Sequence, residues 1–117
     1  MKVDQLKKYC FALDLKDDTE KINAYIAHHK KVWPEILNSI REAGIENAEI
    51  YHTGTRLFMT IEANAQFSLE KKAKSDAENP KVQQWELLMW EYQQALPGTP
   101  SGTKWVLMDK IFYLNTN

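Results

Sequence analysis

Hydrophobic and polar positions at the start of the chain follow first a strand-like and then a helix-like period. Residues 9–15 form a compact apolar run that ends in Lys16-Asp17-Asp18, which predicts a β-strand. Asp17 and Glu20 then have the spacing of a capping box, so a helix is expected to begin here.

The first helix is expected in two segments. Pro34 lacks an N–H group and disfavours the helical conformation at Trp33, so the helix is interrupted there. Proline suits the first turn of a helix, and a second segment is therefore expected to continue as far as Gly44, a plausible stop. In the first segment, four side chains spaced by three and four residues form one stripe along the helix: Ile22, Tyr25, Ile26 and His29.

The second half repeats these periods without repeating the sequence. Residues 48–53 and 57–63 flank Gly54-Thr55-Arg56, which predicts a β-hairpin. A helical stretch begins near Ser68 and reaches Asn79-Pro80. Asn79 there has the character of an N-cap, and Pro80 suits the first helical position after it. Its apolar stripe comprises Val82, Trp85, Leu88, Met89 and Tyr92.

The last element is a strand, and it completes the topology. Residues 96–100 read as a loop, and residues 105–114 are rich in aromatic and branched side chains that favour a strand. The order is therefore β-α-β-β-α-β, the ferredoxin-like arrangement. We expect an α+β fold over residues 1–117, a single domain with a four-stranded antiparallel sheet and its helices on one face.

Both faces of the predicted strands carry apolar side chains. In the hairpin, Met59 and Ile61 point to one face and Phe58 points to the other. A bare apolar sheet face usually marks an interaction surface or a ligand cavity. We expect a homodimer that packs through this sheet face, with a pocket between the sheet and the first helix.

Composition excludes several classes of partner. The chain has 117 residues with 15 Lys+Arg and 16 Asp+Glu, so no charge excess indicates nucleic acid or an acidic membrane. No apolar run approaches the roughly 18–20 residues that span a bilayer. Cys10 is the single cysteine and cannot form an intrachain disulfide, so a cytoplasmic location is expected.

Three side chains on the first helix could carry chemistry. Tyr25, His29 and Trp33 step by four residues and lie along one stripe. Imidazole takes and gives a proton near neutrality, a phenol can hold a sugar or the imidazole, and an indole offers a flat apolar face. On composition alone, the blander explanation is that Tyr25 and Trp33 are core and that His29 is a satisfied polar group at its edge.

The remaining polar and aromatic residues are less specific. Trp85 falls on the second helix's apolar stripe, where core packing explains it, and Glu86 beside it is either exposed or faces a pocket. The three histidines do not have a metal-ligand spacing, and no phosphate-binding or nucleophile motif is present. We therefore expect no metal site.

Taken together, these residues resemble the L-rhamnose mutarotase family. The resemblance rests on Tyr25-x3-His29-x3-Trp33-Pro34-Glu35 and is supported by Ile50-Tyr51, Leu57-Phe58, Trp85 and Phe112-Tyr113-Leu114. It runs from about Tyr9 to Leu114. It implies a dimeric ferredoxin-like α/β barrel that interconverts the anomers of a 6-deoxy sugar, a monosaccharide, without cofactor or metal.

The resemblance also implies a role for each matching residue. His29 matches the family's proton-donating histidine, and Tyr25 matches its substrate-contacting tyrosine. Trp85 matches the first of two tandem tryptophans that contact the sugar. The other expected substrate contacts are Trp33, Glu86 and Tyr51.

Three departures from the family pattern bear on the substrate. Glu86 stands in place of the second tryptophan, Ala48 replaces a sugar-contacting tyrosine, and residues 97–102 replace an Asn-Pro-Asp-Asn loop. A pocket that loses two aromatic faces and gains a carboxylate suits a differently arranged set of hydroxyls. L-fucose, another 6-deoxyhexose, is the leading alternative substrate to L-rhamnose, on chemical similarity and not on any residue.

Two other functions remain as alternatives. The same scaffold hosts cofactor-independent monooxygenases and haem-degrading enzymes, because fold does not fix function. A module that binds a small ligand without catalysis is the second. The spacing of Tyr25, His29 and Trp33 favours the mutarotase over both.

Overall fold

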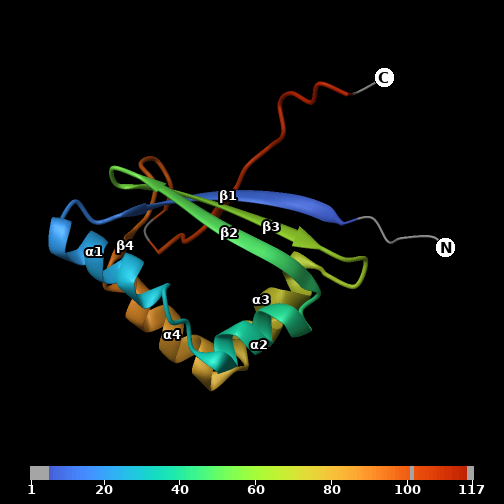
Figure 1. Cartoon of the computed structure of the whole chain (residues 1–117), viewed down its shortest axis with the longest axis horizontal. Helices are drawn as coiled ribbons and strands as arrows, with labels where there is room; N and C mark the ends of the chain where they lie inside the picture. Colours follow the sequence, from blue (N-terminus) through green and yellow to red (C-terminus); the bar gives the residue numbers. More distant parts are fainter. Residues whose placement is uncertain (1–5, 101, 116–117) are drawn as a thin grey trace.

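One antiparallel sheet carries all of the helices on one of its faces (Figure 1). The computed structural model describes residues 6–100 and 102–115. The elements are β1 (Lys7–Leu15), α1 (Thr19–His28), α2 (Pro34–Glu42), β2 (Ile45–Thr53), β3 (Arg56–Ala63), α3 (Leu69–Ala77), α4 (Pro80–Trp90), β4 (Gln93–Gln94) and β5 (Val106–Leu107). The strands lie in the order β2-β3-β1-β4, and β5 also pairs with β1. This arrangement confirms the ferredoxin-like α+β fold.

Proline divides each helical crossover into two short helices, as the sequence predicts. Pro34 occupies the first turn of α2, and Pro80 occupies the first turn of α4. The Asn79 side chain caps α4 by accepting hydrogen bonds from the amides of Lys81 (3.0 Å) and Val82 (3.3 Å). In the first crossover, the break makes His29 the C-cap residue of α1.

Within the described residues, the sheet has five strands where four were expected, because Gln93–Gln94 adds a short strand, and several element boundaries differ from the sequence prediction. The cap of α1 is Asp18 and not Asp17, because the Asp18 carboxylate reaches the Lys21 amide at 3.1 Å. The strand expected over residues 105–114 comprises only Val106–Leu107. Beyond the bond from the Met108 amide to the Cys10 carbonyl, the chain runs away from the sheet (Figure 1), and no strand of the described chain pairs with it.

The core lies between the helices and the sheet face that they cover. Leu13 and Leu57 are paired across β1 and β3 and are almost completely buried. One cluster of buried side chains contains Tyr25, Trp85 and Met89, so the aromatic residues singled out by the sequence are built into this core. Burial of side chains of this size supplies about 1.5–3 kcal/mol each, which makes this layer rigid.

The other face of the sheet carries no helix (Figure 1). Tyr51 of β2 lies opposite Phe58 of β3 in the register, and their rings are 6.3 Å apart. The helix-facing neighbours of this pair, Ile50 and Met59, line the cavity described below, and strand alternation directs Tyr51 and Phe58 outward. Among the described residues, no helix is long and apolar enough to cross a membrane.

Candidate active site

A cavity of about 650 Å³ lies between the sheet and the helices. Its wall is mostly apolar, with side chains from β1, β2 and β3 on one side and from α1, α2 and α4 on the other. Two separate groups of polar side chains interrupt this wall. One is the ion pair between Lys72 and Asp76 of α3 (2.8 Å); the other comprises Tyr25, His29, Glu86, Gln93 and Lys104.

His29 is held in one tautomer by the end of its own helix. Its Nδ1 lies 2.9 Å from the Tyr25 carbonyl oxygen. Because a carbonyl only accepts, Nδ1 carries the proton and Nε2 of the neutral ring is left as an acceptor. Burial lowers the pKa of His29 below 6.5, which outweighs the raising effect of the Tyr25 hydrogen bond, and nearby His28 lowers it further. At neutral pH the imidazole is therefore an uncharged base.

Tyr25 provides a buried phenol beside this imidazole. Its side chain is 3% exposed, and its ring centroid lies 4.4 Å from that of His29. Burial raises the pKa of Tyr25 to about 12, although the hydrogen bond donated by Gln93 Nε2 to the Tyr25 Oη (3.4 Å) acts in the other direction. The phenol therefore stays protonated at neutral pH, and its O–H is available to donate a hydrogen bond.

Trp85 forms an aromatic wall next to the imidazole. Its ring meets His29 edge to face at 5.7 Å and Trp33 edge to face at 5.1 Å. Such pairs contribute about 0.5–1.5 kcal/mol beyond the burial of area. Trp33 is not among the residues that line the cavity. It packs behind Trp85, so its position suits a role in fixing that ring.

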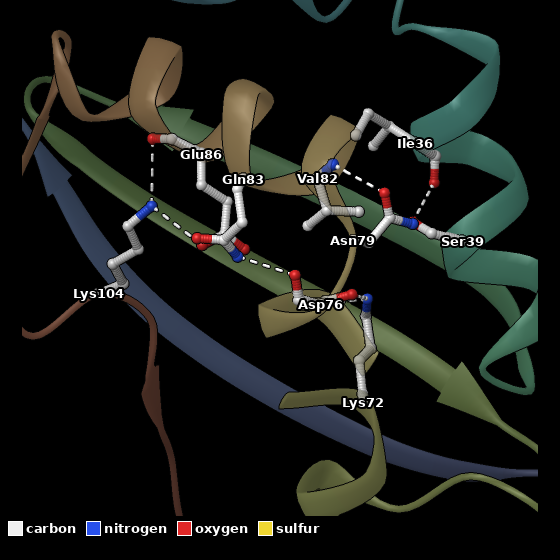
Figure 2. Close-up of polar contacts among 9 residues, drawn as sticks. All are labelled: Ile36, Ser39, Lys72, Asp76, Asn79, Val82, Gln83, Glu86 and Lys104. Carbon is white, nitrogen blue, oxygen red and sulfur yellow. Dashed lines mark hydrogen bonds and ion pairs between the residues drawn. The ribbon is translucent and has the colours of Figure 1, made fainter. Parts of the chain in front are cut away.

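Glu86 lines the cavity and has a partner that the sequence did not single out. Lys104 Nζ lies 3.5 Å from the Glu86 carboxylate and donates a hydrogen bond to the Glu86 backbone carbonyl at 3.2 Å (Figure 2). The same ammonium group lies 5.0 Å from the centre of the Trp90 ring. Burial lowers the pKa of Lys104, while the Glu86 charge and hydrogen bond counteract that effect. Lys104 thus fixes the carboxylate at the cavity wall.

Tyr51 lies outside the cavity, and its expected contact with a substrate in this cavity has to be corrected. Its side chain is 56% exposed on the outer sheet face and donates a hydrogen bond to Glu49 at 3.1 Å. The reason is the two-residue period of β2, which directs Ile50 inward and its neighbour outward. The structure brings Tyr25, His29, Trp85 and Glu86 to one cavity.

Gln93 is a further cavity residue that sequence reasoning missed. It lies in β4, paired with Leu15 of β1, and is 4% exposed. The helical period of α4 does not predict it, because α4 ends at Trp90 and Gln93 follows in β4. Lys104 likewise carries no sequence signal, since only the tertiary fold brings it beside α4.

The titratable groups of the described chain do not gather into a metal-binding cluster. No group of three or more His, Cys, Asp or Glu side chains within residues 6–100 and 102–115 is close enough to hold a metal ion. The chemistry that this cavity offers through its own side chains is proton transfer by a neutral imidazole and a protonated phenol.

Comparisons with known sequences point to one family. The L-rhamnose mutarotase family model matches residues 8–114. A protein of Xanthomonas campestris pv. campestris named L-fucose mutarotase is 40% identical over 112 residues, which cover 94% of this chain and 90% of that protein. A UPF0734 protein of Dictyostelium discoideum is 36% identical over 113 residues, which cover 93% of this chain and 90% of that protein.

Comparisons with solved structures show the fold. The L-rhamnose mutarotase of Formosa agariphila superposes with a TM-score of 0.69 at 20% identity, covering 92% of this chain and 98% of that chain. Tetracenomycin F2 cyclase of Streptomyces glaucescens superposes with a TM-score of 0.58 at 15% identity, covering 92% and 94%. At these identities, the shared property is the ferredoxin-like architecture.

The hydrogen bonds of two histidines predict opposite neutral tautomers. His29 Nδ1 faces the Tyr25 carbonyl, whereas Nε2 of the exposed His52 faces the Gly54 carbonyl at 2.7 Å. A long-range ¹H–¹⁵N spectrum at pH 8 should therefore show His29 protonated on Nδ1 and His52 protonated on Nε2. An Nε2-protonated His29 would contradict the assigned base.

Proposed function

Because this chain belongs to the L-rhamnose mutarotase family, we propose that its cavity opens and recloses the ring of a 6-deoxyhexose, with L-fucose preferred over L-rhamnose. The chain is a sugar mutarotase and hence an isomerase. The preference for L-fucose is supported by the name of the relative at 40% identity. Ala48 and Glu86, which replace aromatic residues that the family resemblance leads one to expect, favour a sugar other than L-rhamnose.

Interconversion of two anomers requires two proton transfers. A base removes the proton of the anomeric hydroxyl, and an acid protonates the ring oxygen as the bond between C1 and that oxygen breaks. The product is a free aldehyde with a new hydroxyl at C5. Rotation about the C1–C2 bond and reclosure on the other carbonyl face give the second anomer. A positioned acid or base typically contributes about 10²–10⁴-fold to such a step.

The observation that carries the mechanism is the pairing of a neutral imidazole with a protonated phenol. His29 Nε2 takes the anomeric proton, since Nδ1 is already occupied by its bond to the Tyr25 carbonyl. Tyr25 Oη gives its proton to the ring oxygen. Ring opening then leaves an imidazolium beside a phenolate, and their ring centroids are only 4.4 Å apart. Reclosure returns both protons, so the protein is unchanged at the end.

The remaining cavity residues bind and orient the sugar. Trp85 offers a flat surface to the apolar face of the pyranose, and Trp33 holds that indole from behind. The Glu86 carboxylate accepts a hydrogen bond from a sugar hydroxyl. Lys104 keeps this carboxylate in place and partly neutralises its charge. These roles account for binding and leave the chemistry to His29 and Tyr25.

Exchange spectroscopy of the anomeric protons tests this function. Catalytic amounts of the protein should accelerate exchange between the anomers of L-fucose more than those of L-rhamnose. His29→Ala should lose about 10²–10⁴-fold in rate, and Tyr25→Phe should be impaired in the same direction. His52→Ala, on the exposed hairpin turn, is the matched control and should match the wild type.

Full activity in folded His29→Ala would contradict the assigned base. A folded wild type that accelerates neither sugar would contradict the substrate class. A preference for L-rhamnose would overturn the choice of L-fucose and leave the reaction intact.

We further propose that the protein acts as a homodimer whose subunits meet at the outer sheet face. This face carries the Tyr51–Phe58 pair, and the chain beyond β5 adds apolar side chains that are largely exposed. Ile111, Phe112 and Leu114 are 95%, 74% and 77% exposed. A monomer rarely leaves an apolar patch of this kind open to water. A cytoplasmic location stays a prediction from the sequence.

Sedimentation velocity at micromolar concentration should show a dimer. Phe112→Asp should shift it to monomer, because a carboxylate is costly to bury at an interface. Leu87→Asp is the matched control, since Leu87 is an equally exposed apolar residue (69%) on α4, away from the outer sheet face. A monomeric wild type, or a Phe112→Asp variant that remains dimeric, would refute this interface.

A further inference from the structure

Gln93 places a carboxamide in the cavity wall, and half of that carboxamide has no partner among the residues that the structure describes. Its Nε2 donates to Tyr25 Oη at 3.4 Å. Its Oε1 is buried, and no donor among the described residues lies within hydrogen-bond distance. It is the one buried side-chain polar atom of the described chain in this condition.

A buried acceptor without a donor is unfavourable, and native proteins pair nearly all such atoms. Rotating the amide by 180° would exchange its two heteroatoms but would still leave one of them without a partner. The neighbouring buried side chains Trp85 and Met89 line the same cavity as Gln93. Because Gln93 lines the cavity, a molecule bound there is in a position to supply the missing partner.

The direction of the hydrogen bond to Tyr25 determines which groups are left for a ligand. The phenol oxygen accepts from Gln93 Nε2, so its own O–H remains available to donate. Gln93 Oε1 remains available to accept. The two side chains thus present one donor and one acceptor side by side, which matches two neighbouring oxygens of a pyranose, since each sugar hydroxyl can both donate and accept.

We propose that Gln93 is a sugar-recognition residue of this cavity. Its Oε1 accepts a hydrogen bond from one hydroxyl of the pyranose, while the Tyr25 O–H donates to a neighbouring oxygen of the same sugar. This assignment rests on the proposed function, because it names the polar contact through which that substrate class is selected. Sugars that lack the recognised hydroxyl leave the amide oxygen buried and unpaired, and are rejected for that reason.

The test combines a nearly isosteric variant with deoxy sugars. Gln93→Met keeps the volume of the side chain and removes both polar atoms, and Gln94→Met alters its exposed neighbour in β4. The value of kcat/KM is measured by anomer exchange for L-fucose and for its 2-deoxy, 3-deoxy and 4-deoxy analogues. Each rate is divided by the spontaneous rate of the same sugar.

We expect the wild type and Gln94→Met to discriminate against one of the three analogues by at least tenfold. Gln93→Met should lose about tenfold on L-fucose and should treat L-fucose and that analogue alike, because the contact that distinguishes them is gone. Gln93→Glu should also be impaired. The new carboxylate would accept a hydrogen bond from the Tyr25 O–H, which would then no longer be available to the sugar.

Three results would overturn the proposal. They are an unchanged kcat/KM in Gln93→Met, continued discrimination by this variant against the same analogue, and an equal loss on all four sugars, which would reduce Gln93 to a positioning residue for Tyr25.

If the wild type accelerated no exchange, the proposed function would fail. Saturation-transfer NMR of the same sugars would then decide on Gln93 separately, with weaker binding to Gln93→Met supporting the contact and equal or no binding refuting it.

Discussion

The hydrogen bond from His29 Nδ1 to the Tyr25 carbonyl links the local fold of the first crossover to the chemistry of the cavity. Pro34 prevents one continuous helix, and α1 ends at His28. The backbone amide of His29 bonds to the Ile26 carbonyl at 3.1 Å, so the Tyr25 carbonyl is left for the imidazole. A helix end thereby selects the tautomer, and burial in an apolar cavity selects the uncharged form. Together they produce a base at neutral pH from an ordinary histidine.

The same break also positions the aromatic wall. Trp33 directly precedes Pro34 and packs against Trp85, which in turn packs against His29. Tyr25 and Trp85 belong to the buried core as well as to the cavity, so the groups that would move protons and hold the sugar are fixed by the packing that stabilises the fold. Packing rigidity of this kind preorganises a site, since little rearrangement is needed when the substrate enters.

Much of this arrangement could be predicted from the sequence because it depends on local signals. The proline breaks, the Asn79 cap and the hairpin around Gly54 are short-range features, and the four-residue step brought Tyr25 and His29 together. The features that were missed depend on tertiary neighbours. Lys104 reaches Glu86 only through the fold, and residues 108–114 have a strand-like composition but no adjacent strand within the part of the chain that the structure describes. Tyr51 was misplaced because its apolar character does not reveal which sheet face lines the cavity.

The most direct test of a neutral, buried His29 acting as the base is the pH dependence of kcat/KM for catalysed anomer exchange, corrected for the spontaneous rate. This parameter reports the ionisation of the free enzyme. Burial lowers the pKa of His29 from 6.5, so the rate should fall towards acid pH as the imidazole gains a proton, with the midpoint of that fall below pH 6.5. A rate that rises as the pH falls through this range, or an acid limb centred above 6.5, would contradict the account.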